Sequence, residues 1–560
     1  MRRAVMLAVA IAAVSAGAGL SARQPVRAQH AMVAAREAHA TDAGLAVLES
    51  GGNAIDAAVA VGFVLAVTHP SAGNLGGGGF MLVRFADGRS TFIDFRERAP
   101  GKASHDMYIG PDGKVTRDSL DGYRASGVPG TVRGFELAHE KYGHKPWKEL
   151  VEPAVRIASE GFPVSYGLAH SLSSKHTAER LGKFPESKRI FLRDGKFYEP
   201  GEKLVQPELA QTLARIRDRG AKDFYEGETA AVLAADMREH GGLITLDDLK
   251  TYRAVERQPL TGRYKGYTII TAPPPSSGGV GVLQMLGMLE GTGFEKYGAG
   301  SAGAVHFMAE AMRRYFADRS EYMGDPDFYS VPVSGLLNPR YIAERRRSID
   351  PERATSSDSL GPGKPLSYES TQTTHYSIVD AEGNAVAVTY TLNNGYGSAV
   401  TATKLGFLLN DEMDDFAPKP GEANAYGLIQ GEANAVQPRK TPLSSMTPTI
   451  VLRGGKLYLV VGSPGGPTII NTVLEVAVNV MDFGMNVADA VDFPRFHHQW
   501  KPDVLQLERG FSPDTVALLE GRGYTVKLAG GQGEVAAIRL DGGWLEGSAD
   551  PRTEGTAKGY

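Results

Sequence analysis

One stretch in the last third of the chain constrains the fold more than any other. Residues 373–380 read Thr-Thr-His-Tyr-Ser-Ile-Val-Asp, and a turn signal follows at residues 380–384. A second run, rich in β-branched residues, occupies positions 385–391. We therefore expect a β-hairpin with Thr373 at the mouth of its first strand. A threonine in the middle of a chain is ordinarily a plain strand residue, so local chemistry alone does not make Thr373 a nucleophile.

Segments of helical and strand character alternate along the rest of the chain. Residues 41–50 predict a helix capped by Thr41, and residues 54–68 predict an almost wholly apolar helix capped by Asn53. Further helices are expected over residues 304–319, which read as amphipathic, 467–481 and 513–521, and strands over residues 80–85, 90–95, 404–410, 449–453, 456–462, 524–528 and 535–540. This alternation predicts a mixed α+β layered fold.

Composition excludes several classes of protein. A chain of 560 residues with 42% hydrophobic content can bury a large core, and a net charge of −4 without a basic stripe argues against a nucleic-acid partner. The absence of cysteine excludes disulfides, thiolate catalysis and Cys-ligated metals. His497 and His498 are adjacent, but no third ligand lies at a useful spacing, so we expect neither metal nor cofactor.

The N-terminus has the features of a secretory signal. Two arginines precede an apolar run over residues 4–19, and small residues allow cleavage after Ala28. The run is short for a membrane span and rich in Ala and Gly, so we expect a cleaved signal over residues 1–28 rather than a stable membrane anchor. The mature protein is then periplasmic or secreted.

Two glycine-rich segments indicate special backbone arrangements. Residues 76–79 are four consecutive glycines, but no lysine and no helix follow, so a nucleotide-phosphate loop is rejected in favour of close backbone packing. Residues 463–466 lie between a strand and a helix that begins at Pro467. Free N–H groups there would suit an oxyanion, and a plain strand-to-helix turn fits the same pattern.

Several motifs recur in an order that resembles the γ-glutamyltranspeptidases, which are N-terminal-nucleophile hydrolases. These are the stretches at residues 94–97, 373–377, 391–393, 408–416, 442–446 and 462–466. The resemblance runs from about residue 31 to 560. It implies an αββα sandwich, autocatalytic cleavage between Gln372 and Thr373, a large subunit over residues 29–372 and a small subunit over residues 373–560.

The resemblance also implies the roles of individual residues. They divide into a nucleophile, the residues that assist it, and the residues that bind the two charged groups of a γ-glutamyl donor. Thr373 would be the nucleophile, Thr391 its hydrogen-bond partner, Gly465 and Gly466 the oxyanion donors, Arg96, Ser444 and Ser445 the α-carboxylate ligands, and Asn393, Glu412 and Asp415 the α-amine ligands. Some relatives carry Gln where Glu412 stands. The loop over residues 415–427 would cover the site.

The chemistry of such a site is consistent with the sequence. No acid-base triad accompanies Thr373, but a threonine at a new N-terminus can use its own α-amine, with a pKa of about 7.7–8.0, as the base. Glutathione and other γ-glutamyl compounds are the implied donors, and water, amino acids or peptides the acceptors. The alternatives are a glutaryl-type cephalosporin acylase of the same fold, a catalytically inactive periplasmic binding protein for γ-glutamyl compounds, and a serine hydrolase, which would need a G-x-S-x-G elbow that is missing.

Overall fold

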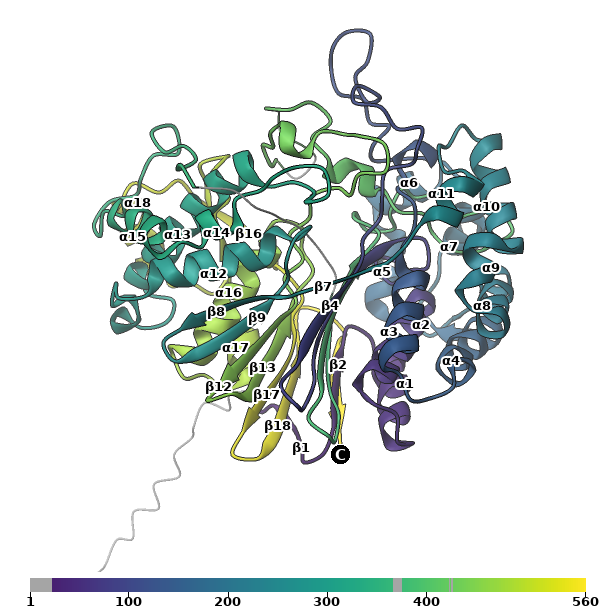
Figure 1. Ribbon diagram of the computed structural model, residues 1–560, viewed down its shortest axis with the longest axis horizontal. Coiled ribbons are helices and arrows are strands. Elements are labelled where there is room, and N and C mark those ends of the chain that lie inside the picture. Colours follow the sequence, from purple (N-terminus) through teal and green to yellow (C-terminus); the bar gives the residue numbers. More distant parts are fainter. Residues whose placement is uncertain (1–22, 366–374, 423, 425–426) are drawn as a thin grey trace, which may run out of the picture.

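The computed structural model describes residues 23–365, 375–422, 424 and 427–560 (Figure 1). Gln372 and Thr373, the expected cleavage site, lie outside the described residues, as does most of the expected signal peptide. Parts of the loop expected to cover the site are also outside them. In the described ranges no helix is both long enough and apolar enough to cross a lipid bilayer.

Two seven-stranded sheets form the centre of the molecule (Figure 1). Sheet A has the order β1 (Val26–Ala28), β18 (Trp544–Ala549), β17 (Ala536–Asp541), β13 (Lys456–Gly462), β12 (Thr449–Arg453), β9 (Tyr267–Thr271), β8 (Leu260–Tyr264). Sheet B has the order β19 (Thr556–Gly559), β2 (Met32–Ala35), β10 (His375–Val379), β11 (Ala385–Thr391), β3 (Gly78–Arg84), β4 (Ser90–Phe95), β7 (Val255–Arg257). Each sheet therefore combines strands from before and after position 373.

Alternating side chains on the strands build separate cores on the two faces of each sheet. On β3, Phe80 and Leu82 join the cluster between the sheets, where they meet Ile450 and Ile538 of sheet A. Their neighbour Met81 belongs instead to the cluster under the helices. Because both faces of the central strands are covered, β3 and β11 are buried at every position.

Helices cover the outer face of each sheet (Figure 1). The layer beside sheet B contains α1 (Ala38–Glu49), α2 (Ala54–Thr68), α3 (Thr131–Tyr142), α4 (Trp147–Glu160), α5 (Tyr166–Ser173), α6 (Lys175–Leu181), α7 (Pro185–Leu192), α8 (Pro207–Arg219), α9 (Ala221–Glu226), α10 (Glu228–Glu239) and α11 (Leu246–Thr251). The layer beside sheet A contains α12 (Ser277–Leu289), α13 (Ala302–Tyr322), α14 (Val333–Leu336), α15 (Pro339–Arg347), α16 (Thr468–Met481), α17 (Val487–Asp492) and α18 (Pro513–Gly521). The order of layers is αββα, and the predicted α+β sandwich is confirmed.

Smaller elements complete the chain. They are the three-stranded sheet of β14 (Phe496–His497), β15 (Leu505–Glu508) and β16 (Val526–Ala529), and the pair β5 (Phe162–Pro163) and β6 (Lys203–Leu204).

Elements with strong local signals form where the sequence predicts them. Helix α2 has Asn53 as its N-cap, and Asp56 completes a reciprocal capping box. The hairpin of β12 and β13 turns at Gly454 and Gly455, both with positive φ. The hairpin of β10 and β11 also forms, with His375 opposite Thr389.

Three local predictions are wrong. Helix α1 starts three residues before Thr41, because the Glu37 side chain accepts hydrogen bonds from the backbone N–H groups of His39 and Ala40. Residues 404–410 form no strand, since Lys404 has a φ of 64° and the chain turns back on Ala402. Helix α13 is not amphipathic, because every residue from Ala302 to Arg319 is buried.

The glycine run packs backbone against backbone, as expected. A Cβ atom on Gly77 would lie 1.9 Å from the carbonyl oxygen of Thr391, and one on Gly79 would lie 2.4 Å from that of Thr389. The run thereby brings β3 against the end of β11, where the predicted site begins.

Candidate active site

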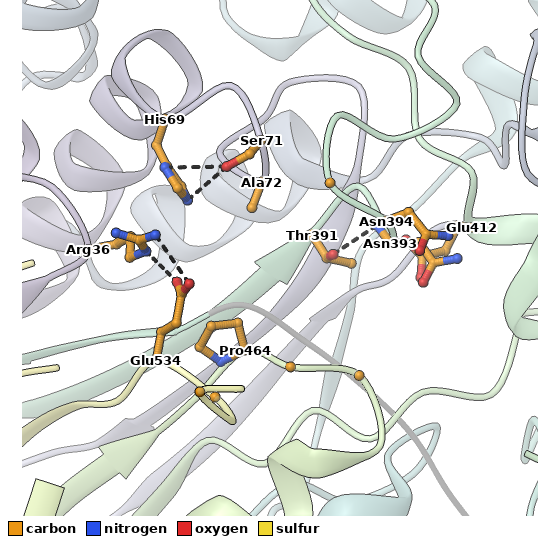
Figure 2. A pocket seen from close by; sticks show the side chains of 15 residues that line it. Arg36, His69, Ser71, Ala72, Thr391, Asn393, Asn394, Glu412, Pro464 and Glu534 are labelled. Atoms are coloured by element: carbon orange, nitrogen blue, oxygen red, sulfur yellow. Dashed lines mark hydrogen bonds and ion pairs between the residues drawn. The ribbon is translucent and has the colours of Figure 1, made fainter. Parts of the chain in front are cut away.

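A pocket of about 400 Å³ opens at the end of β11 (Figure 2). It brings together five of the predicted site residues, Thr391, Asn393, Glu412, Gly465 and Gly466. The other lining residues are Arg36, His69, Ser71, Ala72, Asn394, Gly395, Pro464, Gly531, Gly533 and Glu534. Strand β10, which begins at His375, pairs with β11 and places His375 opposite Thr389, two residues before Thr391 of the pocket.

Thr391 is fixed at the last position of β11. Its carbonyl oxygen accepts from the Asn74 side chain at 2.9 Å, and its Oγ1 accepts from the backbone N–H of Asn393 at 2.8 Å. Asn393 has a left-handed φ of 76° and donates from Nδ2 to the carbonyl oxygen of Asp411 at 3.0 Å. The hydroxyl and the amide are therefore held at the edge of the pocket by backbone geometry.

The segment before α16 has the properties expected of an anion site. Gly465 and Gly466 have φ values of 135° and 57°, which glycine adopts readily. The carbonyl oxygen of Gly465 accepts from the N–H and the Oγ1 of Thr468, at 3.2 and 2.8 Å. Among the described residues, none accepts a hydrogen bond from the N–H of either glycine. Two backbone donors at a helix N-terminus thus border the pocket.

Arg96 and its acidic partners form a buried charge cluster behind Glu412. The Arg96 Nη2 atom donates to Asp415 Oδ2 at 2.6 Å, and Nη1 pairs with Glu412 Oε1. A third carboxylate, Glu97, lies 3.5 Å from Nη1. Of these residues only Glu412 lines the pocket. The sequence motif contained Glu97, but nothing in it pointed to this role.

Burial sets the charges of this cluster. It would by itself lower the pKa of Arg96, but the carboxylates, Glu412 foremost, raise it overall. Burial raises the pKa of Glu97 to about 7 and raises the pKa values of Glu412 and Asp415, and Arg96 opposes both of those shifts. One guanidinium cannot balance three carboxylates, so an ammonium group beside Glu412 would be stabilised.

A turn held by Asn410 presents the acidic residues. The Asn410 side chain donates to the carbonyl oxygens of Gly76 and Gly127 at 2.7 and 2.8 Å and accepts from the backbone N–H of Glu412 at 3.0 Å. Residues Glu412–Asp415 then form a 3-10 turn. Sequence reasoning did not single out Asn410, although it stands at the start of the recognised acidic motif.

Ser444 and Ser445 are buried and do not line the pocket. The Oγ of Ser444 has no hydrogen-bond partner among the described residues, which is rare for a buried hydroxyl and suits a ligand contact. Asn434 links this segment to the acidic turn, since its Nδ2 donates to the carbonyl oxygen of Asp415 at 2.6 Å and its Oδ1 accepts from the N–H of Leu443 at 2.9 Å. Sequence reasoning missed Asn434, which lies in a loop-like stretch.

His375, next to the predicted nucleophile, and the adjacent pair His497 and His498 have structural roles. Burial lowers the pKa of His375 to about 3, and its ring nitrogens bond the hydroxyls of Thr389 and Ser377 at 3.0 and 2.8 Å. His497 and His498 lie in β14 and the turn after it, bonded to Asn471 and Asp503 among others. The described residues contain no group of three or more His, Cys, Asp or Glu that could hold a metal ion.

Comparison with known proteins identifies the family of this chain. Residues 40–560 match the family model of γ-glutamyltranspeptidase. The glutathione hydrolase proenzyme of Escherichia coli (strain K12) is 52% identical over 531 residues, which are 94% of this chain and 91% of that protein.

Two solved structures extend the comparison. A cephalosporin acylase from Bacillus halodurans has a TM-score of 0.86 at 28% identity, over 96% of this chain and 97% of that chain. A chain of the Helicobacter pylori γ-glutamyltranspeptidase has a TM-score of 0.58 at 45% identity, over 59% of this chain and 94% of that chain. Because the family match covers residues 40–560 and five residues of the recognised motifs line one pocket, this protein belongs to the γ-glutamyltranspeptidase family.

Proposed function

We propose that this chain is a γ-glutamyl hydrolase and transferase that cleaves glutathione and related γ-glutamyl amides. It is made as a proenzyme and cut between Gln372 and Thr373 into subunits of residues 29–372 and 373–560. The name of the E. coli relative, a glutathione hydrolase proenzyme, supports both the substrate and the processing. The interleaving of strands from both subunits in each sheet explains how the two pieces stay together.

The observation that carries the proposal is the pairing of two kinds of group at one pocket. On one side lie the amides of Gly465 and Gly466, and on the other lies Glu412 with the buried Arg96 and Asp415 behind it. The first group suits a tetrahedral oxyanion. The second provides charges of both signs, as an amino-acid zwitterion requires.

The chemistry is acyl transfer through a threonine ester. The α-amine of Thr373 takes the proton from its own hydroxyl, and Oγ1 attacks the γ-carbonyl carbon of the donor. The carbon–nitrogen bond breaks, the proton passes to the leaving nitrogen, and the amine departs. Water or an acceptor amine then attacks the ester, which releases glutamate or a new γ-glutamyl amide and restores the threonine hydroxyl. Gly465 and Gly466 stabilise the oxyanion in both halves, and Thr391 orients the hydroxyl.

The two charged groups of the donor bind to the residues of the buried charge cluster and its neighbours. The α-carboxylate takes Arg96, Ser444 and Ser445, and the α-ammonium takes Asn393, Glu412 and Asp415. Arg96 is paired with both acids in the free protein. When a donor binds, its carboxylate therefore takes the place of the acids at Arg96, and its ammonium takes the place of Arg96 at the acids. Few charges are left unpaired in the complex.

Export to the periplasm or the medium is part of the proposal. The N-terminal signal supports it, and the described residues add a constraint on where the signal ends. Strand β1 pairs with β18, and Arg27 bonds Glu546 at 3.1 Å. Cleavage after Ala28 would remove this edge strand, whereas cleavage before Val26 would keep it.

Direct sequencing of the purified protein tests the proposal. Two N-termini are expected, one at Thr373 and one near Val26 or Gln29, with masses that match the two subunits. The same preparation should release p-nitroaniline from γ-glutamyl-p-nitroanilide. A single uncut chain without this activity would refute the assignment, and a processed chain without it would favour the inactive binding protein.

The cephalosporin acylase reaction is the second candidate, because the acylase fold covers nearly all of this chain. A glutaryl group keeps the terminal carboxylate that matches the α-carboxylate of glutamate, but it lacks the α-ammonium. Such a donor could still pair its carboxylate with Arg96, but it would bring no ammonium to Glu412 and Asp415. The charge cluster therefore favours γ-glutamyl donors.

A further inference from the structure

A second ion pair lies in the pocket, across from Glu412 (Figure 2). Arg36 directly follows β2, and Glu534 lies between β16 and β17. The Nε atom of Arg36 pairs with Glu534 Oε2, and Nη2 donates to Oε1 at 3.2 Å. The backbone N–H of Glu534 donates to Ser463 Oγ at 2.9 Å, which ties this pair to the segment that leads to Gly465.

The pair is built to accept a further anion. The side chains of Arg36 and Glu534 are 22% and 33% exposed, so both are open to the pocket. Glu534 occupies the Nε and Nη2 edge of the guanidinium, and among the described residues none accepts from Nη1. Arginine has donors on both edges and can bind two carboxylates at once. His69 lines the same wall but stays neutral, because burial lowers its pKa to about 3.

The position of the pair relates it to one part of the substrate. Figure 2 shows Thr391 and Pro464 between the Glu412 side and the Arg36 side of the pocket, and Gly465 directly follows Pro464 in the chain. A donor whose amino-acid end lies at Glu412 and whose scissile carbonyl lies at Gly465 and Gly466 must direct its leaving group toward Arg36. The acceptor amine enters by the same route, since transfer to an acceptor is the reverse of leaving-group departure.

We propose that Arg36 is a specificity-determining residue that binds the free carboxylate of the leaving group and of the acceptor. Its ligand class is the amino acid or short peptide with an unblocked C-terminus, such as the cysteinylglycine released from glutathione. Glu534 holds the guanidinium in place and competes with that carboxylate for it. This inference rests on the proposed γ-glutamyl transfer activity. It assigns a role to the side of the pocket that the donor's glutamyl group does not reach.

Two pairs of substrates isolate the carboxylate. Glutathione has a carboxylate on its leaving group, and γ-glutamyl-p-nitroanilide has none. Glycylglycine as acceptor has a carboxylate, and glycylglycinamide has none. In the wild-type enzyme, KM for glycylglycinamide should exceed KM for glycylglycine about tenfold, as expected for one lost charge-assisted hydrogen bond.

Variants of the pair then assign the effect to Arg36. In Arg36→Ala, the ratio of kcat/KM for glutathione to that for the anilide should fall about tenfold, and the preference for glycylglycine over its amide should disappear. Arg36→Lys should keep part of the preference because it keeps the charge. Glu534→Gln should lower KM for glycylglycine, since the competing carboxylate is gone. Arg89→Ala, which removes a surface arginine in the β3–β4 turn, is the matched control and should leave both ratios unchanged.

Several outcomes would overturn the inference. Equal KM values for glycylglycine and glycylglycinamide in the wild-type enzyme would overturn it. This test needs no variant, so it remains valid even if Arg36→Ala folds poorly. An unchanged ratio of kcat/KM for glutathione to kcat/KM for the anilide in folded Arg36→Ala would also overturn the inference. If that variant still cleaves the anilide, the proposed function itself is not affected. A processed wild-type enzyme that cleaves no γ-glutamyl donor would refute the proposed function and this inference together.

Discussion

Arg96 and Asp415 pair at 2.6 Å although they are separated by 319 positions in sequence and by the expected cleavage site. Arg96 directly follows β4, in the proposed large subunit, and Asp415 ends a 3-10 turn in the proposed small subunit. Both side chains are buried, so their contact links the two pieces at the point where the donor's glutamyl group is expected to bind. Under the proposed processing and donor binding, both subunit association and donor binding would depend on these side chains.

The first prediction concerns the nucleophile. Thr373→Ala should remain one uncut chain with no amidase activity, because a single hydroxyl serves both cleavage and turnover. Thr373→Ser should keep part of both, since the hydroxyl and the α-amine remain. Gel electrophoresis with N-terminal sequencing and the anilide assay measure the two functions. Efficient cleavage of the Ala variant would exclude an N-terminal-nucleophile mechanism.

The second prediction concerns the oxyanion donors. Gly466→Pro removes the N–H group and should reduce kcat by roughly 100- to 1000-fold, the usual effect of losing one oxyanion donor. Its φ of 57° is outside the range of proline, so the backbone must also adjust. Gly466→Asn is the matched variant, because asparagine tolerates a left-handed φ and keeps the N–H. Equal losses in two folded variants would show that backbone shape, and not the donor, is what matters.

The third prediction concerns pH. Burial raises the pKa of Glu412, and an ammonium binds its ionised form, so L-glutamate should bind more weakly as the pH falls through the raised pKa. The inhibition constant of L-glutamate between about pH 6 and 7.5 measures this without turnover, in a range where a free γ-carboxyl is already ionised. Glu412→Gln should bind L-glutamate more weakly and with a flatter pH dependence. An identical pH profile in the Gln variant would assign the titration to another group.

The fourth prediction concerns Asn434, a positioning residue. Its replacement by Ala leaves the carbonyl oxygen of Asp415 and the N–H of Leu443 without these bonds, which should lower the free energy of unfolding by about 1–3 kcal/mol. It should also raise KM for γ-glutamyl donors more than it lowers kcat, because Asp415 and Ser444 lose their common support. Thermal unfolding and steady-state kinetics measure the two effects. Glu432→Ala, an exposed neighbour, is the control, and a change in kcat alone would argue against a positioning role.

Local signals explain which parts of the fold the sequence could predict. Asn53 and Asp56 form a cap within four residues, and Gly454 and Gly455 form a turn within two, so both elements were predictable. The strand predicted over residues 404–410 does not form, because Lys404 has a left-handed backbone conformation. The β-favouring composition of this segment does not indicate that conformation.

The site shows the same limit at longer range. Family motifs named Arg96 and Asp415, but their pairing in the free protein depends on contacts across the whole sandwich. Arg36 pairs with Glu534, 498 positions away, and Asn434 joins two segments of irregular backbone, so each looks like an ordinary loop or surface residue when read locally.

The last prediction concerns donor choice. γ-Glutamyl amides should be strongly preferred over glutaryl amides, because a glutaryl chain brings a carboxylate to Arg96 but no ammonium to take the place of Arg96 at Glu412 and Asp415. Sites that bind a polar substrate group can reject analogues without it by about 10⁴-fold. Arg96→Ala should raise KM for γ-glutamyl-p-nitroanilide steeply, and Asp415→Ala should narrow the gap between the two donors by impairing the better one. Equal kcat/KM values for γ-glutamyl and glutaryl p-nitroanilides in the wild-type enzyme would place the protein with the acylases, with its nucleophile unchanged and its substrate reassigned.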